Sequence, residues 1–185
     1  YQGSSSDGWL NPIEGPTSAG TWYYPGGGVH LGVDRAVSVG TPIHAPADGL
    51  IVWAANPADT NGGYLGNWAG YPYGAGNNIA MLVRVNDTTY FVSFSHMAQY
   101  GMTVSAGDSV SQGDVIGLTG NSGNSSGAHC HIEIINLGSM SISEAASQFA
   151  STADFAWGCG WSSPSTGCDS KGSTPCRERP ETLIG

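Results

Sequence analysis

The residues best suited to chemistry are histidines that lie close to acidic side chains. His129 and His131 are one residue apart in SGAHCHIEI, and His30 precedes Asp34 by four positions in HLGVD. Each pattern alone is weak, because the first fits a chance pair of surface histidines and the second fits a surface ion pair. Together they supply the nitrogen and oxygen ligands of catalytic zinc, which takes three protein ligands and keeps a fourth position for water. The combination favours a metal site in which one of the paired histidines binds zinc and the other is a candidate base.

A β-strand must position the histidine pair, because HCHIEII is apolar and rich in β-branched residues. Successive side chains of a strand point to opposite faces, so His129, His131 and Glu133 share one face. Cys130 and Ile132 lie on the other face, where we expect them to pack in the core. One face of this strand therefore packs while the other presents imidazoles.

Short strands separated by turns are expected along most of the chain. GLIVWAA (49–55) fits a buried strand, and NNIAMLVRV and YFVSFSH, joined by NDTT, fit a β-hairpin whose second strand ends at His96. Gly-Asp pairs at 107–108 and 113–114 mark turns between further short strands. The 29 glycines also favour turns over long helices. We therefore predict an all-β, antiparallel, sheet-rich single domain over 1–185, with a substrate groove bounded by long loops.

Three segments are expected to lie outside this sheet. Residues 1–23 are interpreted as an irregular N-terminal arm. Residues 138–177 are interpreted as an insertion that begins with a short helix, since Ser141 and Glu144 in SISEAASQF fit a capping box. The glycine- and aromatic-rich loop 56–76 suits either the wall of the groove or ordinary loop packing.

Cysteine usage predicts one disulfide in the insertion. Cys159, Cys168 and Cys176 lie in a stretch rich in glycine, serine and proline, which has little apolar material to hold it. A metal site is the alternative, but no histidine lies nearby and Cys-x-x-Cys is lacking. Cys130 is interpreted as a buried thiol. A disulfide favours a secreted or cell-surface location.

The charge of the chain limits its partners. The formal net charge is −9 with only five lysines and arginines, which argues against nucleic acid and anionic membranes as partners. The sequence has no membrane-spanning apolar run and no signal-peptide pattern. Because the chain starts at Tyr1, we interpret it as a processed form or an excised domain. We also expect the protein to act as a monomer.

Three stretches resemble the lysostaphin-type, M23 zinc endopeptidases: HLGVDRAVSVGTPIHAPADGLIV, SHMAQYGMTVSAGDSVSQGDVIGLTGNSGNSSGAHCHIEI and RPETLIG. The resemblance covers residues 24–137 and the last few residues. Its motifs are His-x-x-x-Asp, a histidine after a strand, and Gly-x-His-x-His, and they occur in the family's order. The resemblance implies one zinc ion per chain, with His30, Asp34 and His131 as the ligands.

The resemblance also implies roles for the remaining site residues. His96 and His129 become the catalytic histidines, although spacing does not say which is the base and which the acid. Tyr24 falls where related enzymes carry a tyrosine that helps to stabilise the oxyanion, but the adjacent Tyr23 could compete for that role. His44 matches no catalytic position of the family, and we interpret it as a structural or groove-edge residue.

The activity implied by the resemblance is hydrolysis of bacterial peptidoglycan at Gly-Gly cross-bridges or at bonds between D-Ala and a cross-bridge residue. The origin would be bacterial or phage. The alternative is a catalytically inactive M23-like scaffold or binding domain, although such relatives usually lack a ligand that this chain keeps. His-Glu-x-x-His and Glu-x-x-His are absent, which argues against the common zinc-protease patterns. Glu133 matches the family's acidic residue after the pair, which predicts a hydrogen bond to a histidine.

Overall fold

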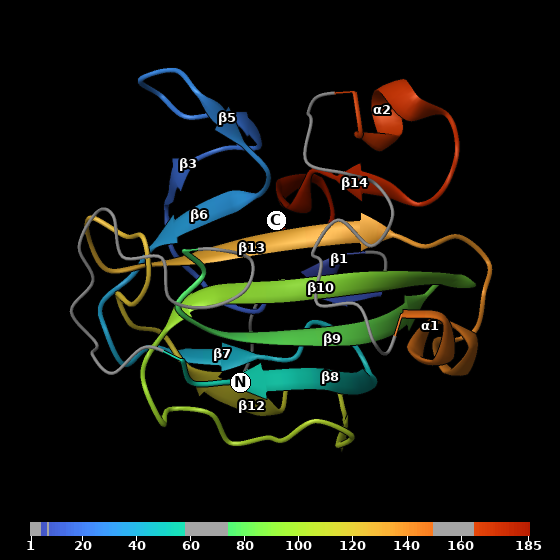
Figure 1. Ribbon diagram of the computed structural model, residues 1–185, viewed down its shortest axis with the longest axis horizontal. Helices are drawn as coiled ribbons and strands as arrows, with labels where there is room; N and C mark the ends of the chain where they lie inside the picture. Colours follow the sequence, from blue (N-terminus) through green and yellow to red (C-terminus); the bar gives the residue numbers. More distant parts are fainter. Residues whose placement is uncertain (1–4, 7, 58–73, 150–164) are drawn as a thin grey trace.

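An antiparallel sheet dominates the computed structural model, which describes residues 5–6, 8–57, 74–149 and 165–185 (Figure 1). Its strands are β3 (Thr17–Ala19), β6 (Val33–Ala36), β8 (Gly49–Ala55), β9 (Asn77–Val85), β10 (Thr88–Met97), β11 (Ser109–Val110), β13 (His129–Asn136) and β14 (Cys176–Glu178). Their order is β11-β8-β9-β10-β13-β6-β3, and β14 pairs with the other end of β13. The prediction of an all-β fold is confirmed.

Smaller elements surround the main sheet. Two-stranded sheets join β1 (Ser5–Ser6) to β2 (Trp9–Leu10), β4 (Trp22–Tyr23) to β5 (Val29–His30), and β7 (Pro42–His44) to β12 (Val115–Leu118). The helical elements are α1 (Ile142–Phe149), α2 (Cys168–Lys171) and the 3-10 turn η1 (Pro180–Thr182). Residues 1–23, which we expected to be irregular, thus contain four strands of two or three residues. Strands this short depend on their partners, and β3 pairs with β6, which follows it in the chain.

The predicted hairpin forms with a tighter turn than NDTT suggests. Thr88 already pairs with Val85, so only Asn86 and Asp87 connect β9 to β10. Both turn residues have positive φ angles, 50° and 63°. This backbone conformation is typical of two-residue hairpin turns, and asparagine and aspartate tolerate it better than most residues do.

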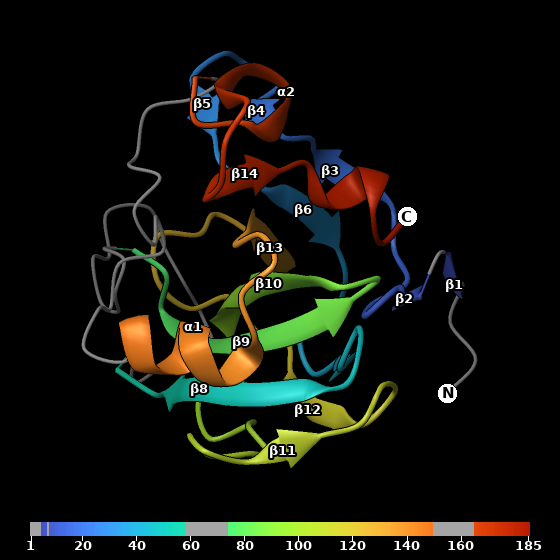
Figure 2. The same cartoon turned by 90° about the vertical axis from the view of Figure 1, so that its right-hand side faces the viewer.

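Apolar side chains bury the main sheet on both faces. On one face, Cys130, Ile132 and Ile134 of β13 join the larger core and are at most 1% exposed. The expected packing face of this strand is therefore confirmed. On the other face, a smaller cluster includes Phe91 and Ala145, and Ala145 belongs to α1. Figure 2 shows α1 lying against β8 and β9.

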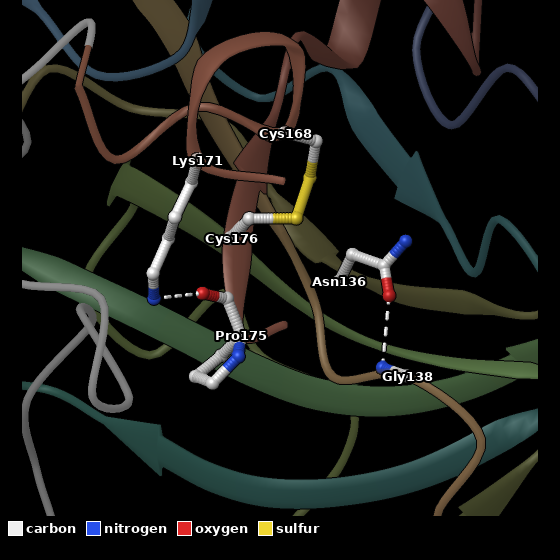
Figure 3. The surroundings of a disulfide bond; sticks show 6 residues. All are labelled: Asn136, Gly138, Cys168, Lys171, Pro175 and Cys176. Atoms are coloured by element: carbon white, nitrogen blue, oxygen red, sulfur yellow. Dashed lines mark hydrogen bonds between the residues drawn. A yellow bond between two sulfur atoms is a disulfide. The ribbon is translucent and has the colours of Figure 1, made fainter. Parts of the chain in front are cut away.

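Two local predictions in the insertion are confirmed. Ser141 caps α1, since its hydroxyl accepts a hydrogen bond from the backbone N–H of Glu144 at 3.0 Å. Cys168 and Cys176 form a disulfide that joins the start of α2 to the start of β14 (Figure 3). Cys130 is a buried free thiol, as expected. The third cysteine of the insertion, Cys159, lies outside the described residues, and so do positions 58–73 of the predicted groove loop.

The described helices place one limit on membrane association. Across residues 5–6, 8–57, 74–149 and 165–185, no helix is long and apolar enough to cross a bilayer.

Candidate metal centre

Three side chains from neighbouring strands converge on one point. His131 of β13 and Asp34 of β6 are direct partners in the strand pair, so their side chains lie on the same face. His131 Nδ1 lies 2.8 Å from Asp34 Oδ1, and His30 Nε2 lies 3.2 Å from the same oxygen. The two imidazole nitrogens, His30 Nε2 and His131 Nδ1, are 3.1 Å apart. The structure therefore brings the three predicted ligands together.

His30 and His131 each use one ring nitrogen for a hydrogen bond to a group outside the three-residue cluster. The other ring nitrogen of each, which faces the cluster, is thus left for a metal. His30 Nδ1 donates to the carbonyl oxygen of Gly20 at 2.8 Å, so the lone pair is on Nε2. His131 Nε2 lies 3.0 Å from Glu133 Oε2, so Nδ1 faces the other two donors. Catalytic zinc takes this donor set of two imidazoles and one carboxylate, and its histidines usually donate their second N–H in this way. The residues present fit a zinc ion.

The charges at this point favour a cation. Burial alone would raise the pKa of Asp34, but the hydrogen bond from His131 and the polar contact with His30 outweigh this effect and hold the pKa well below its usual range. Burial would lower the pKa of His131, yet its hydrogen bonds to Asp34 and Glu133 raise it to about 10. The carboxylates thus stay ionised and favour a positive charge between them. A metal ion would take the place of the proton on His131 Nδ1.

A β-bulge turns His96 toward the same place. In a regular strand Ser95, which pairs with His131, would share its face, and His96 would point away. The register of β10 shifts between Phe94 and Met97, and His96 has a φ of 61°. Its ring centre consequently lies 4.7 Å from that of His129. Non-glycine residues in this conformation are uncommon and concentrate at functional sites.

His96 and His129 both keep Nε2 available. His96 Nδ1 donates to the carbonyl of Ser122 at 2.7 Å, and His129 Nδ1 donates to the carbonyl of Gly127 at 2.8 Å. Burial, aided by the nearby imidazoles, lowers the pKa of His96 to about 3. Burial also lowers the pKa of His129, although Asp34 opposes the shift. Both imidazoles are therefore neutral at pH 7 and can accept a proton.

Tyr24 lies against His30, one of the three candidate metal ligands. Its ring stacks on that of His30 with 4.2 Å between ring centres. The hairpin turn before β5 positions it, since the Tyr24 N–H donates to the carbonyl of Gly28, and Gly27 and Gly28 have φ angles of 94° and 90° that suit glycine. Burial and the charge of Asp34 raise the pKa of Tyr24, so its hydroxyl stays protonated. Tyr24 is 44% exposed and Tyr23, the competing candidate, is 59% exposed, so the ring contact with His30 rather than burial favours Tyr24.

The remaining predicted residues divide into two groups. His44 lies in β7, outside the main sheet, and its Nδ1 donates to the carbonyl of Gly113 at 2.9 Å. Glu133 forms the histidine contact expected of it and also binds Arg177 NH1 at 2.5 Å. Neither Arg177 nor the Gly20 carbonyl was predicted. Strand pairing brings Arg177 to the site, and the Gly20 carbonyl reaches it through a hydrogen bond from the His30 side chain, so no local pattern marks either of them.

Comparisons with known proteins identify the family of the chain. The model of Peptidase family M23 matches residues 28–142. The glycyl-glycine endopeptidase ALE-1 of Staphylococcus capitis is 33% identical over 135 residues, which cover 71% of this chain and 32% of that protein. The peptidoglycan DD-endopeptidase ShyA of Vibrio cholerae is 34% identical over 109 residues, which cover 59% of this chain and 21% of that protein. The chain thus spans about a third or less of these curated relatives.

A solved structure shows the same fold. The catalytic domain of the antimicrobial peptidase lysostaphin from Staphylococcus simulans superposes with a TM-score of 0.51 at 31% identity, covering 69% of this chain and 84% of that chain. The matched family segment includes His30, Asp34, His96, His129 and His131. The chain belongs to peptidase family M23 and has a lysostaphin-like fold.

Proposed function

We propose that the chain is a zinc-dependent endopeptidase that hydrolyses peptide cross-bridges or stem–bridge bonds of bacterial peptidoglycan. The observation that carries the proposal is the convergence of His30 Nε2, Asp34 Oδ1 and His131 Nδ1, whose mutual distances are 2.8 to 3.2 Å. The names of the relatives support the substrate class, since one is a glycyl-glycine endopeptidase and another a peptidoglycan DD-endopeptidase. Because the proposed substrate lies in the bacterial wall, we propose that the protein is secreted or on the cell surface. We also propose that it is a monomer.

His30, Asp34 and His131 would hold the zinc ion. When bound, zinc would supply a Lewis acid that polarises the scissile carbonyl and lowers the pKa of water, so that the water loses a proton and attacks near neutral pH. Two neutral imidazoles and one carboxylate would leave the zinc ion and its ligands with a net charge near +1. Hydrogen bonds to the Gly20 carbonyl and to Glu133 keep both imidazoles oriented.

His96 and His129 would move the protons. Each is neutral at pH 7 because burial lowers its pKa, and each has its Nδ1–H bound to a backbone carbonyl, so Nε2 carries the lone pair. The pair takes a proton from the attacking water and returns it to the leaving amine, which is general acid–base catalysis. The Tyr24 hydroxyl would donate a hydrogen bond to the oxygen that becomes negative in the transition state.

Digestion of two kinds of peptidoglycan tests the proposal. The zinc-loaded protein is incubated with sacculi that contain oligoglycine bridges and with sacculi that contain direct D-Ala cross-links, and mass spectrometry identifies the new termini. We expect new amino termini at one of the two bond types. A protein that binds zinc and releases no new termini from either substrate would instead be the inactive scaffold.

A further inference from the structure

We propose that the C-terminal segment Cys176–Thr182, which comprises β14 and η1, orients both metal-binding histidines, with Arg177 and Glu181 as positioning residues. Both lie beyond residues 28–142, the part that the family model matches. The inference rests on the metal site of the proposed function and adds a structural role for residues that touch neither substrate nor metal.

The first relay runs from Arg177 through Glu133 to His131. Arg177 is 1% exposed, and its NH1 donates to Glu133 Oε1 at 2.5 Å. The other oxygen of the same carboxylate, Oε2, accepts the hydrogen bond from His131 Nε2 at 3.0 Å. Because both oxygens are engaged, the carboxylate cannot rotate without breaking one bond. Arg177 thereby fixes the plane of Glu133, and Glu133 directs His131 Nδ1 toward Asp34.

Strand pairing explains why Arg177 reaches this carboxylate. β14 pairs with the end of β13, and Arg177 is the direct partner of Ile135. Ile135 lies on the same face of β13 as Glu133 and His131, two and four residues before it, since faces alternate along a strand. Arg177 therefore projects over the face that carries the metal ligand, diagonal to Glu133.

The second relay runs from Glu181 through one peptide group to His30. Glu181 Oε2 accepts a hydrogen bond from the Thr21 N–H at 2.9 Å, and its Oε1 accepts from the Thr21 hydroxyl at 2.5 Å. The carbonyl of Gly20, which belongs to the same peptide group as the Thr21 N–H, accepts from His30 Nδ1 at 2.8 Å. A negative carboxylate thus polarises the peptide group that binds the imidazole. Aligned hydrogen bonds of this kind strengthen one another.

The disulfide anchors this segment. Cys176 is the first residue of β14 and is bonded to Cys168, and Lys171 Nζ donates to the Pro175 carbonyl just before the strand (Figure 3). The disulfide and this hydrogen bond therefore hold the chain immediately before Arg177, the last residue of the insertion. The end of the insertion thus supports the candidate metal site.

Matched substitutions test whether Arg177 and Glu181 act on the metal site. Arg177→Met and Glu181→Gln are compared with Arg35→Met, which removes a buried guanidinium that binds backbone carbonyls, and with Glu178→Gln, which alters a carboxyl in the same segment. Zinc affinity is measured by competition with a chromophoric chelator, and ligand geometry by the visible absorption of the Co²⁺-loaded protein. Loss of a direct hydrogen-bond partner of a ligand weakens metal binding about 10- to 100-fold, and because Arg177 and Glu181 act one contact further out, we expect each test variant to bind zinc about 10-fold more weakly. The Co²⁺ bands should shift in the test variants and stay unchanged in both controls.

Further outcomes separate the relay from general destabilisation. Arg177→Lys keeps the charge beside Glu133 and should recover most of the zinc affinity lost in Arg177→Met. If Arg177→Met does not fold, the Glu181→Gln and Arg177→Lys comparisons decide. A parent protein that binds zinc and test variants that match it in affinity and Co²⁺ spectrum would overturn the inference while leaving the proposed function intact. A parent protein that binds no zinc would reject both.

Discussion

His131→Ala should greatly weaken metal binding and His129→Ala should not, although the two residues share one face of β13. His131 Nδ1 lies 2.8 Å from Asp34 Oδ1 and 3.1 Å from His30 Nε2, at the centre of the donor set. His129 Nε2 is 3.7 Å from Asp34 Oδ1, and its Nδ1 is bonded to the Gly127 carbonyl. The first substitution removes a metal donor, whereas the second removes a proton carrier beside it.

The expected magnitudes follow from these contacts. Loss of an outer hydrogen-bond partner weakens metal binding about 10- to 100-fold, so loss of His131 itself should weaken it more than about 100-fold, or about 2.8 kcal/mol. His131→Ala also leaves the buried Glu133 without its imidazole partner. His129→Ala should change zinc affinity only a few-fold, while turnover falls about 10²- to 10⁴-fold, the usual contribution of general acid–base catalysis.

Two measurements on the same preparations check this prediction. Zinc affinity is determined by chelator competition, and turnover is measured by release of new amino termini from peptidoglycan at saturating zinc. His44→Ala is the matched control and should change neither quantity. His44 is a buried histidine of the separate β7–β12 sheet, and its side chain is bonded to the Gly113 carbonyl. Equal loss of zinc from His131→Ala and His129→Ala would refute the assignment of ligand and proton carrier.

Three further predictions concern pH, covalent structure and the oxyanion. Burial lowers the folded pKa of His96 to about 3. Protonation therefore favours unfolding, and the stability contribution is full above the unfolded pKa of roughly 6.5 and is lost as the pH falls toward 3. Between pH 7 and 5 the metal-free parent should lose about 2 kcal/mol more stability than His96→Gln, measured by urea denaturation. Replacing Cys168 and Cys176 with serine opens a loop with a sequence separation of 8 and should lower the free energy of unfolding by about 2.5 kcal/mol. Tyr24→Phe keeps the ring stacked on His30 and should lower kcat about 10²- to 10³-fold with unchanged zinc affinity. Tyr23→Phe should leave both parameters unchanged, and a parent-like kcat in Tyr24→Phe would exclude Tyr24 as the oxyanion donor.

Local patterns in the sequence predicted much of the sheet and its two-faced strand. GLIVWAA corresponds to β8 and HCHIEII to all but the last residue of β13, because alternation and β-branched content are short-range signals. The convergence of His30, Asp34 and His131 could be predicted for a related reason, since strand alternation and family motifs both constrain it.

Features that depend on long-range register could not be predicted in this way. The bulge that turns His96 into the site becomes visible only when β10 is aligned with β9 and β13. Arg177 is one of five basic residues in the sequence, and only the pairing of β14 with β13 makes it a partner of Glu133. The short strands β3 and β4 likewise follow from their partners β6 and β5, which lie beyond residue 23, rather than from their own composition.

The separation of the metal donors along the chain determines the order of folding and metal capture. His131 lies 101 residues after His30 and 97 after Asp34. An unfolded chain would have to close that loop before it could offer three donors, at an entropic cost of about 4 kcal/mol plus a constant. The folded sheet, by contrast, already aligns these donors, since β6 pairs with β13 and residues of both strands pack in the apolar core. We therefore predict that a zinc ion held by these donors binds to the folded chain, and that a chelator removes the ion without unfolding the protein.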